Sequence, residues 1–123
     1  MDLCFAPARE LALLLKKREL SATELMRAFI ERIERVNPKV NAIVTLLPEP
    51  ALQAAKALDR KSSLEGPLSG LPIAYKDLLP TKGVRTTFGS LVYENHVPQE
   101  DHLIVERLGA AGAILIGKSN TPE

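Results

Sequence analysis

A lysine at the end of a short apolar run is the first residue whose type and position could do chemistry. Lys76 and Asp77 follow directly on the apolar run from Leu71 to Tyr75. In an α/β sheet, ligands gather at the carboxyl ends of the strands. A lysine buried there loses its proton more readily, because desolvation disfavours the ammonium form, and a neutral amine can act as a general base. The alternative is a strand-end lysine that extends its ammonium group to solvent.

A second pattern concerns nucleotide binding. The segment from Gly112 to Ser119 satisfies the P-loop pattern G-x-x-x-x-G-K-S/T. That pattern binds phosphate only when its four variable residues form a loop after a strand and before a helix. Here the variable residues indicate a buried strand, the segment before Gly112 indicates a helix, and Asn120 to Pro122 does not suit a helix interior. A P-loop-like nucleotide binder is therefore the weaker alternative.

The sequence around Lys76 carries a resemblance. Residues 66–77, GPLSGLPIAYKD, resemble the glycine- and proline-containing strand that leads into the catalytic lysine of the amidase-signature family. Three further segments resemble that family in the same order along the chain: Gly83 to Ser90, Asp101 to Ala113, and Gly117 to Glu123. The last is similar to the family's Gly-Lys-Thr-Asn-x-x-Glu motif, with serine in place of threonine. Together, the ordered segments identify the chain as a member of this family.

The resemblance implies a reaction and a role for one residue. Family members cleave carbon-nitrogen amide bonds with a serine nucleophile, a second serine in a cis peptide and a lysine. Lys76 would be that lysine and the general base, taking a proton from the cis serine, which deprotonates the nucleophile to give an acyl-enzyme. The resemblance implies a small-molecule amide substrate and no cofactor or metal. It does not distinguish a simple amidase from the amidotransferase subunit that feeds ammonia to misacylated tRNA.

The two serines of the family have no counterpart in this chain. In the family they lie in a glycine- and serine-rich stretch after the motif that ends here at Glu123. The pair Ser62-Ser63 precedes Lys76 and lacks flanking glycines, so it receives no catalytic role; nor do Ser69, Ser90 and Ser119. We therefore expect residues 1–123 to form the N-terminal part of a single amidase domain, and we expect this part to be inactive by itself.

A non-catalytic role is the remaining alternative. A truncated or split remnant could fold, or associate with a partner, without turning over any substrate. Its sheet would have an unpaired edge strand, which favours pairing with another chain. This interpretation predicts an oligomer, or a partner chain that completes the sheet.

The elements that must position Lys76 follow from local patterns. In the first half, apolar periodicity, the capping box at Ser21 to Glu24 and the prolines predict a helix, a helix, a strand and a helix. Their expected ranges are a helix between Pro7 and Lys17, a helix from Ser21 to Asn37-Pro38, a strand from Val40 to Leu46 closed by Pro48 and Pro50, and a helix from Ala51 to Leu58. A loop from Lys61 to Gly70 follows.

The second half predicts a strand, a helix and a strand. The expected ranges are Leu71 to Tyr75, Asp101 to Ala111 with Gly109 and Gly112 ending the helix, and Ala113 to Ile116. Such a unit favours a parallel strand pair. The predicted fold class is α/β, with N-terminal helices and the first strands of a mixed, largely parallel sheet. Residues 1–60 would form the helical layer and first strand, and residues 66–123 the strand, lysine loop, helix and strand.

The composition of the chain bears on its binding partners and on its cellular compartment. Sixteen basic and fifteen acidic residues give a net charge of +1, so direct nucleic-acid contact is not favoured. The longest apolar run near the start, Leu11 to Leu15, is too short to span a membrane. The single cysteine, Cys4, fits a reducing compartment, and we expect a cytoplasmic protein.

Several other polar residues are expected to be structural. His96 and His102 have no second ligand at metal spacing, so surface or capping roles are expected. Asp77 is expected to bond loop backbone, and Lys118 and Asn120 to organise turns beneath the site.

Overall fold

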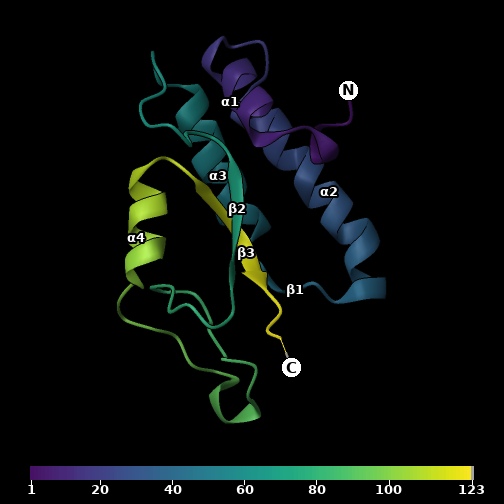
Figure 1. The fold of residues 1–123 in the computed structure, drawn as a ribbon, viewed down its shortest axis with the longest axis vertical. Helices are drawn as coiled ribbons and strands as arrows, with labels where there is room; N and C mark the ends of the chain where they lie inside the picture. The colour runs from purple at the N-terminus through teal and green to yellow at the C-terminus, as the bar shows by residue number, and fades with distance from the viewer. Residues whose placement is uncertain (123) are drawn as a thin grey trace.

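The computed structural model describes residues 1–122 and shows an α/β arrangement (Figure 1). Glu123, the last residue of the predicted motif, lies outside the described residues. The helices α1 and α2 lie on one side of the strands β2 and β3, and α4 lies on the other (Figure 1). The elements in chain order are η1 (Leu3–Phe5), α1 (Ala8–Lys16), α2 (Ala22–Val40), β1 (Ile43–Leu46), α3 (Pro48–Asp59), β2 (Pro72–Lys76), η2 (Leu91–Tyr93), α4 (Leu103–Ala110) and β3 (Ile114–Ser119).

The sheet is mixed, as predicted. Its three strands lie in the order β1-β3-β2. Strand β2 pairs with β3 in parallel, and β1 pairs with β3 antiparallel. The crossover between the parallel strands contains α4, as expected for a strand-helix-strand unit. Strand β3 is thus central, and β1 and β2 are the edges of this sheet.

The core lies between the sheet and the N-terminal helices. Leu15 of α1, Leu25 of α2 and Ala55 of α3 are at most 1% exposed, and they cluster with Ile114 and Ile116 of β3. Burying a large aliphatic side chain contributes about 1.5–3 kcal/mol. The apolar stripes that predicted α1 and α2 therefore point to this core, and they hold the sheet against the helical layer.

Helix α2 begins as predicted but ends later. The Ser21 hydroxyl accepts a hydrogen bond from the Glu24 backbone N–H at 3.0 Å, which is the N-cap that the sequence indicated. The predicted end at Asn37-Pro38 is wrong, because the helix runs to Val40. Pro38 lies in the last turn, where a missing N–H costs one hydrogen bond. Asn41, in the left-handed conformation with φ of 48°, ends the helix.

The prolines after β1 have a different role from the one predicted. Pro48 and Pro50 do not close the strand; they lie in the first turn of α3, which begins at Pro48 rather than Ala51. The first turn tolerates proline because its N–H groups have no partner within the helix. Strand β1 begins at Ile43 rather than Val40, because the longer α2 includes Val40.

The boundaries of the second half also shift. Helix α4 ends at Ala110, so Gly109 lies within its last turn and does not end it. Gly112, with φ of +102°, makes the turn into β3. Strand β3 continues past the predicted Ile116 to Ser119. The extension matters for the site, since it places Gly117, Lys118 and Ser119 in the sheet.

Candidate functional site

Lys76 lies at the carboxyl end of a parallel strand pair, as the sequence predicted, although β2 runs from Pro72 to Lys76 and includes this lysine instead of ending at Tyr75. Its register partner in β3 is Ser119, and the preceding pair is Tyr75 with Lys118. Paired residues in neighbouring strands share a face of the sheet, and successive residues alternate. Lys76 and Ser119 therefore belong to one face, and Tyr75 and Lys118 to the other.

The side chain of Lys76 is exposed. The desolvation that would favour a neutral amine is therefore not supplied by residues 1–122. Segments that pack over this end of the sheet would have to supply it.

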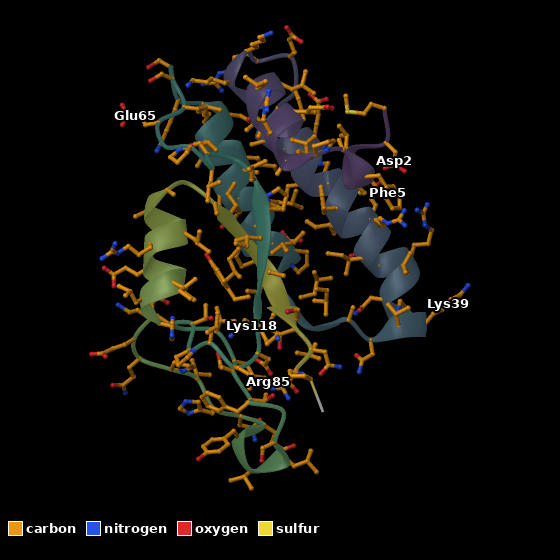
Figure 2. The ribbon with its side chains drawn as sticks, in the orientation of Figure 1. Asp2, Phe5, Lys39, Glu65, Arg85 and Lys118 are labelled. Atoms are coloured by element: carbon orange, nitrogen blue, oxygen red, sulfur yellow. The ribbon has the colours of Figure 1, made fainter. Side chains whose placement is uncertain are left out.

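The buried lysine of this region is Lys118. Its side chain is 0% exposed, although it carries an ammonium group. The Nζ atom donates hydrogen bonds to the Leu79 carbonyl oxygen and to Thr86 Oγ1, each at 2.8 Å, and lies 3.7 Å from Asp77 Oδ1. Burial lowers the pKa of Lys118 from its ordinary value of 10.5, and the Asp77 carboxylate opposes that shift. In Figure 2, Lys118 lies near the end of the sheet, close to the segment that carries Arg85.

The Asp77 carboxylate contacts both the loop at Thr87 and the ammonium group of Lys118. Its side chain is buried, and Oδ2 accepts hydrogen bonds from the backbone N–H of Thr87, at 3.1 Å, and from the Thr87 hydroxyl. Its own N–H donates to the Ser119 carbonyl at 2.9 Å. The predicted bonding of Asp77 to loop backbone is confirmed. Together, Asp77 and Lys118 connect residues 77–87 to β3.

The loop beyond Asp77 has a small aromatic cluster at its far end. The rings of Phe88, Tyr93 and His96 lie with centroids 5.3 to 5.9 Å apart. His102 is the N-cap of α4, where its Nδ1 accepts from the Ile104 N–H at 3.1 Å, so the predicted capping role is confirmed. In residues 1–122, no group of three or more His, Cys, Asp or Glu side chains is placed to hold a metal ion.

Tyr75 is the remaining titratable group at this end of β2. It is 5% exposed and shares a face of the sheet with Lys118. Burial, and secondarily the Asp101 carboxylate, raise the pKa of Tyr75. Its hydroxyl therefore stays protonated to higher pH than a free tyrosine.

The structure contradicts the P-loop alternative. Three of the four variable residues, Ile114 to Ile116, lie in strand β3, whereas a phosphate-binding loop needs the variable residues as a loop with free N–H groups. The Lys118 ammonium group is buried and contacts Asp77, Leu79 and Thr86, so it cannot reach a nucleotide in solvent. The prediction that Lys118 organises a turn is confirmed by its hydrogen bond to the Leu79 carbonyl. Nothing in the local pattern indicated that this lysine, rather than Lys76, would be the fully buried one.

Among the serines considered from the sequence, only one is paired with Lys76. Ser69 Oγ donates to the Glu65 carbonyl, and Ser90 Oγ accepts from the Val92 N–H, so both stabilise turns. Ser62 and Ser63 are exposed and lie in the bend after α3, before β2 begins. Ser119 is the register partner of Lys76 in the parallel pair.

Comparisons with known proteins identify the family to which this fold belongs. A family model described as Amidase matches residues 24–123. The A subunit of the glutamyl-tRNA(Gln) amidotransferase of Geobacter metallireducens is 46% identical over 125 residues, an alignment that covers 100% of this chain and 26% of that protein. A fatty acid amide hydrolase structure matches with a TM-score of 0.90 and 25% identity, covering 98% of this chain and 22% of that one.

A third match carries the family name. A bacterial aryl acylamidase of the amidase-signature family matches with a TM-score of 0.89 and 25% identity, covering 96% of this chain and 26% of that one. The chain spans about a quarter of the length of the relatives that it matches. No helix in residues 1–122 is both long and apolar enough to cross a membrane. The family match over residues 24–123, together with these likenesses, shows that the chain belongs to the amidase-signature family.

Proposed function

We propose that this chain is the lysine-bearing N-terminal part of a single amidase domain that cleaves a carbon-nitrogen amide bond through a serine acyl-enzyme. Lys76 is its general base. The observation that carries the proposal is the position of Lys76 at the carboxyl end of β2, beside the central strand β3, within a chain of this family. Catalytic groups of α/β sheets gather at this end of the strands.

The proposed reaction needs two serines from outside residues 1–123. The amine of Lys76 takes a proton from a serine in a cis peptide, that serine takes the proton of the nucleophilic serine, and the nucleophile attacks the amide carbonyl carbon. The leaving amine departs with a proton, and water then hydrolyses the ester. Lys76 is exposed here, so the downstream part of the domain must also shield it from solvent.

The substrate class follows from the more similar of these relatives. The chain is 46% identical to an amidotransferase A subunit but 25% identical to the two hydrolases compared above. We therefore propose a small-molecule amide as the substrate, with glutamine, a primary amide, as the first compound to assay and an anilide, a secondary amide, as the second.

A non-catalytic partner module is the second candidate. The exposed Lys76 and the edge position of β2 favour it, because an open strand edge can pair with another chain. Analytical ultracentrifugation separates the two candidates in part: a well-behaved monomer contradicts a module that must pair through this edge.

The test joins residues 1–123 to the part of the Geobacter metallireducens relative that follows the matched region. We expect the chimera to release ammonia from glutamine or aniline from an anilide. Lys76→Ala should lower the turnover by at least about 100-fold, the range typical of a general base. Lys82→Ala, which removes an exposed lysine six positions on, is the matched control and should leave the rate within about twofold. Turnover by Lys76→Ala within about tenfold of the parent would refute the proposed role.

A further inference from the structure

A charged side chain with no access to solvent lies in β3, the strand paired with the one that bears Lys76. Lys118 is the largest fully buried side chain of the chain's described residues, ahead of Leu15, Leu25 and Met26. Lysine is almost never fully buried unless its charge is paired. The three oxygen atoms around its Nζ come from Asp77, Leu79 and Thr86, all within the ten residues after Lys76. This ammonium group therefore holds one particular loop.

Four contacts hold the turn after Lys76, one to Lys76 itself and three to residues of β3. The Leu79 N–H donates to the Lys76 carbonyl at 2.9 Å, and the Leu79 carbonyl accepts from Lys118. The Asp77 N–H donates to the Ser119 carbonyl, and its carboxylate faces Lys118. Leu79 therefore joins the two lysines: its carbonyl accepts from the Lys118 ammonium group, and its N–H donates to the backbone of Lys76.

The contact between the two lysines is indirect. Lys76 and Lys118 belong to opposite faces of the sheet, so the Lys118 ammonium group cannot meet a substrate bound beside Lys76. The side-chain contacts of Lys118 reach Lys76 through residues 77–79. An effect of this kind is a positioning effect and not a catalytic contact.

Fold stability alone is a poor explanation for this pair. Buried ion pairs often contribute little net stability compared with well-packed apolar residues of the same volume, and their best-supported use is to specify one arrangement. Asp77 Oδ1 is buried with no hydrogen-bond partner among the described residues, where it lies 3.7 Å from the Lys118 ammonium group. The arrangement that this pair specifies is the turn directly after Lys76.

We propose that Lys118 is a positioning residue for Lys76: with Asp77, it fixes the turn at residues 77–79 against β3 and so holds the end of β2 in one geometry. The proposal rests on the proposed function for its catalytic meaning. Its physical content is the order of the backbone at Lys76, which can be measured without turnover.

The experiment measures backbone order at Lys76 by ¹⁵N relaxation in the 123-residue chain. In the parent we expect an order parameter near 0.85 for the amides of Lys76, Asp77 and Leu79, the value of a rigid backbone. In Lys118→Met it should fall below about 0.6 at these three residues, while the amides of α2 keep their values. Unchanged order at residues 76–79 would overturn the proposal, and so would an equal loss throughout the chain, which indicates loss of the fold as a whole.

A rescue experiment separates the ammonium group from the mere volume of the side chain. The chain has a single cysteine, so a Cys4→Ser and Lys118→Cys protein can be alkylated in denaturant with 2-bromoethylamine at one site only. The product restores an ammonium group at the length of lysine. Order at residues 76–79 should return after refolding, and alkylation with iodoacetamide, which adds no charge, should not restore it. Equal recovery with both reagents would contradict the proposal.

A milder variant keeps the proposal testable if Lys118→Met does not fold. Thr86→Val preserves shape and the ammonium group but removes one of its hydrogen-bond partners, and it should lower order at residues 76–79 less than Lys118→Met does. No change there would count against the proposal. The outcome for the proposed function stays separate: if the chimera keeps its activity after Lys76→Ala, Lys76 is not the base, whatever the relaxation data show.

Discussion

Four glycine-to-alanine substitutions test how the backbone conformation and the surroundings of each glycine contribute to the stability of the fold. Gly109 lies in α4 with no heavy atom within 4 Å of an added Cβ, and Gly83 has φ of +74° but equally open surroundings. At Gly117 the φ is ordinary, but an added Cβ would meet the Thr45 carbonyl oxygen of β1. Gly112 combines both restrictions, since φ is +102° and the Cβ would lie 2.5 to 2.8 Å from Ser69 atoms. The four sites therefore separate backbone strain from steric conflict.

The expected changes in the free energy of unfolding follow from these restrictions. Alanine at Gly109 should stabilise the chain by about 0.5–1 kcal/mol, because glycine in a helix is entropically costly. Alanine at Gly83 should cost about 1 kcal/mol of backbone strain. Alanine at Gly117 should cost about 2 kcal/mol, because β1 must move away. Alanine at Gly112 should cost about 4 kcal/mol, the sum of a strained φ and a clash with backbone.

Urea unfolding followed by far-ultraviolet circular dichroism measures this series. The chain has no tryptophan, so its helices provide the signal. The order from most to least stable should be Gly109→Ala, parent, Gly83→Ala, Gly117→Ala and Gly112→Ala. A Gly112→Ala protein as stable as Gly83→Ala would refute the close packing of the Ser69 turn against the start of β3.

Two other predictions concern charged groups in the fold. The Asp59 carboxylate accepts hydrogen bonds from the first backbone N–H groups of α2, at 2.7 and 3.0 Å, so Asp59→Ala should lower the free energy of unfolding by about 1–2 kcal/mol in the urea assay. Asp59→Asn should cost less, and equal losses would argue against a charge effect. Burial lowers the pKa of Lys118 below 10.5, so between that lowered pKa and pH 10.5 the unfolded chain binds more protons and stability rises with pH. The free energy of unfolding of the parent, measured relative to that of Lys118→Met, should therefore rise across this window. Asp77, Tyr75 and Arg85 are present in both proteins, so the difference reports on Lys118. A difference that stays flat or falls with pH would contradict the assigned burial.

The elements of this fold could be predicted well where a pattern reports directly on burial. The stripes of α1 and α2 and the apolar runs of β2 and β3 all lie where expected, because each has a face that must leave water. Prolines were less informative: Pro48 lies in the first turn of α3, where an N–H has no partner within the helix, and Pro38 lies in the last turn of α2, where its missing N–H costs one hydrogen bond without ending the helix. A proline in the sequence does not by itself show whether a helix ends before it, ends just after it or begins at it.

In the candidate site, too, some features could be predicted from local patterns and others could not. The position of Lys76 at a strand end could be predicted because the apolar run before it defines the strand. The burial of Lys118 could not, because it depends on Asp77, Leu79 and Thr86, which approach it only after the loop folds back over β3. Local periodicity carries no information about such contacts.

The central claim is that Lys76 supplies the base for acylation, and a burst experiment on the chimera tests it most directly. Rapid mixing with an activated anilide measures the first release of aniline, which reports formation of the acyl-enzyme separately from its hydrolysis. Lys76→Ala should slow this burst by at least about 100-fold, with Lys82→Ala unchanged. A burst in Lys76→Ala within about tenfold of the parent rate would show that another group activates the nucleophile.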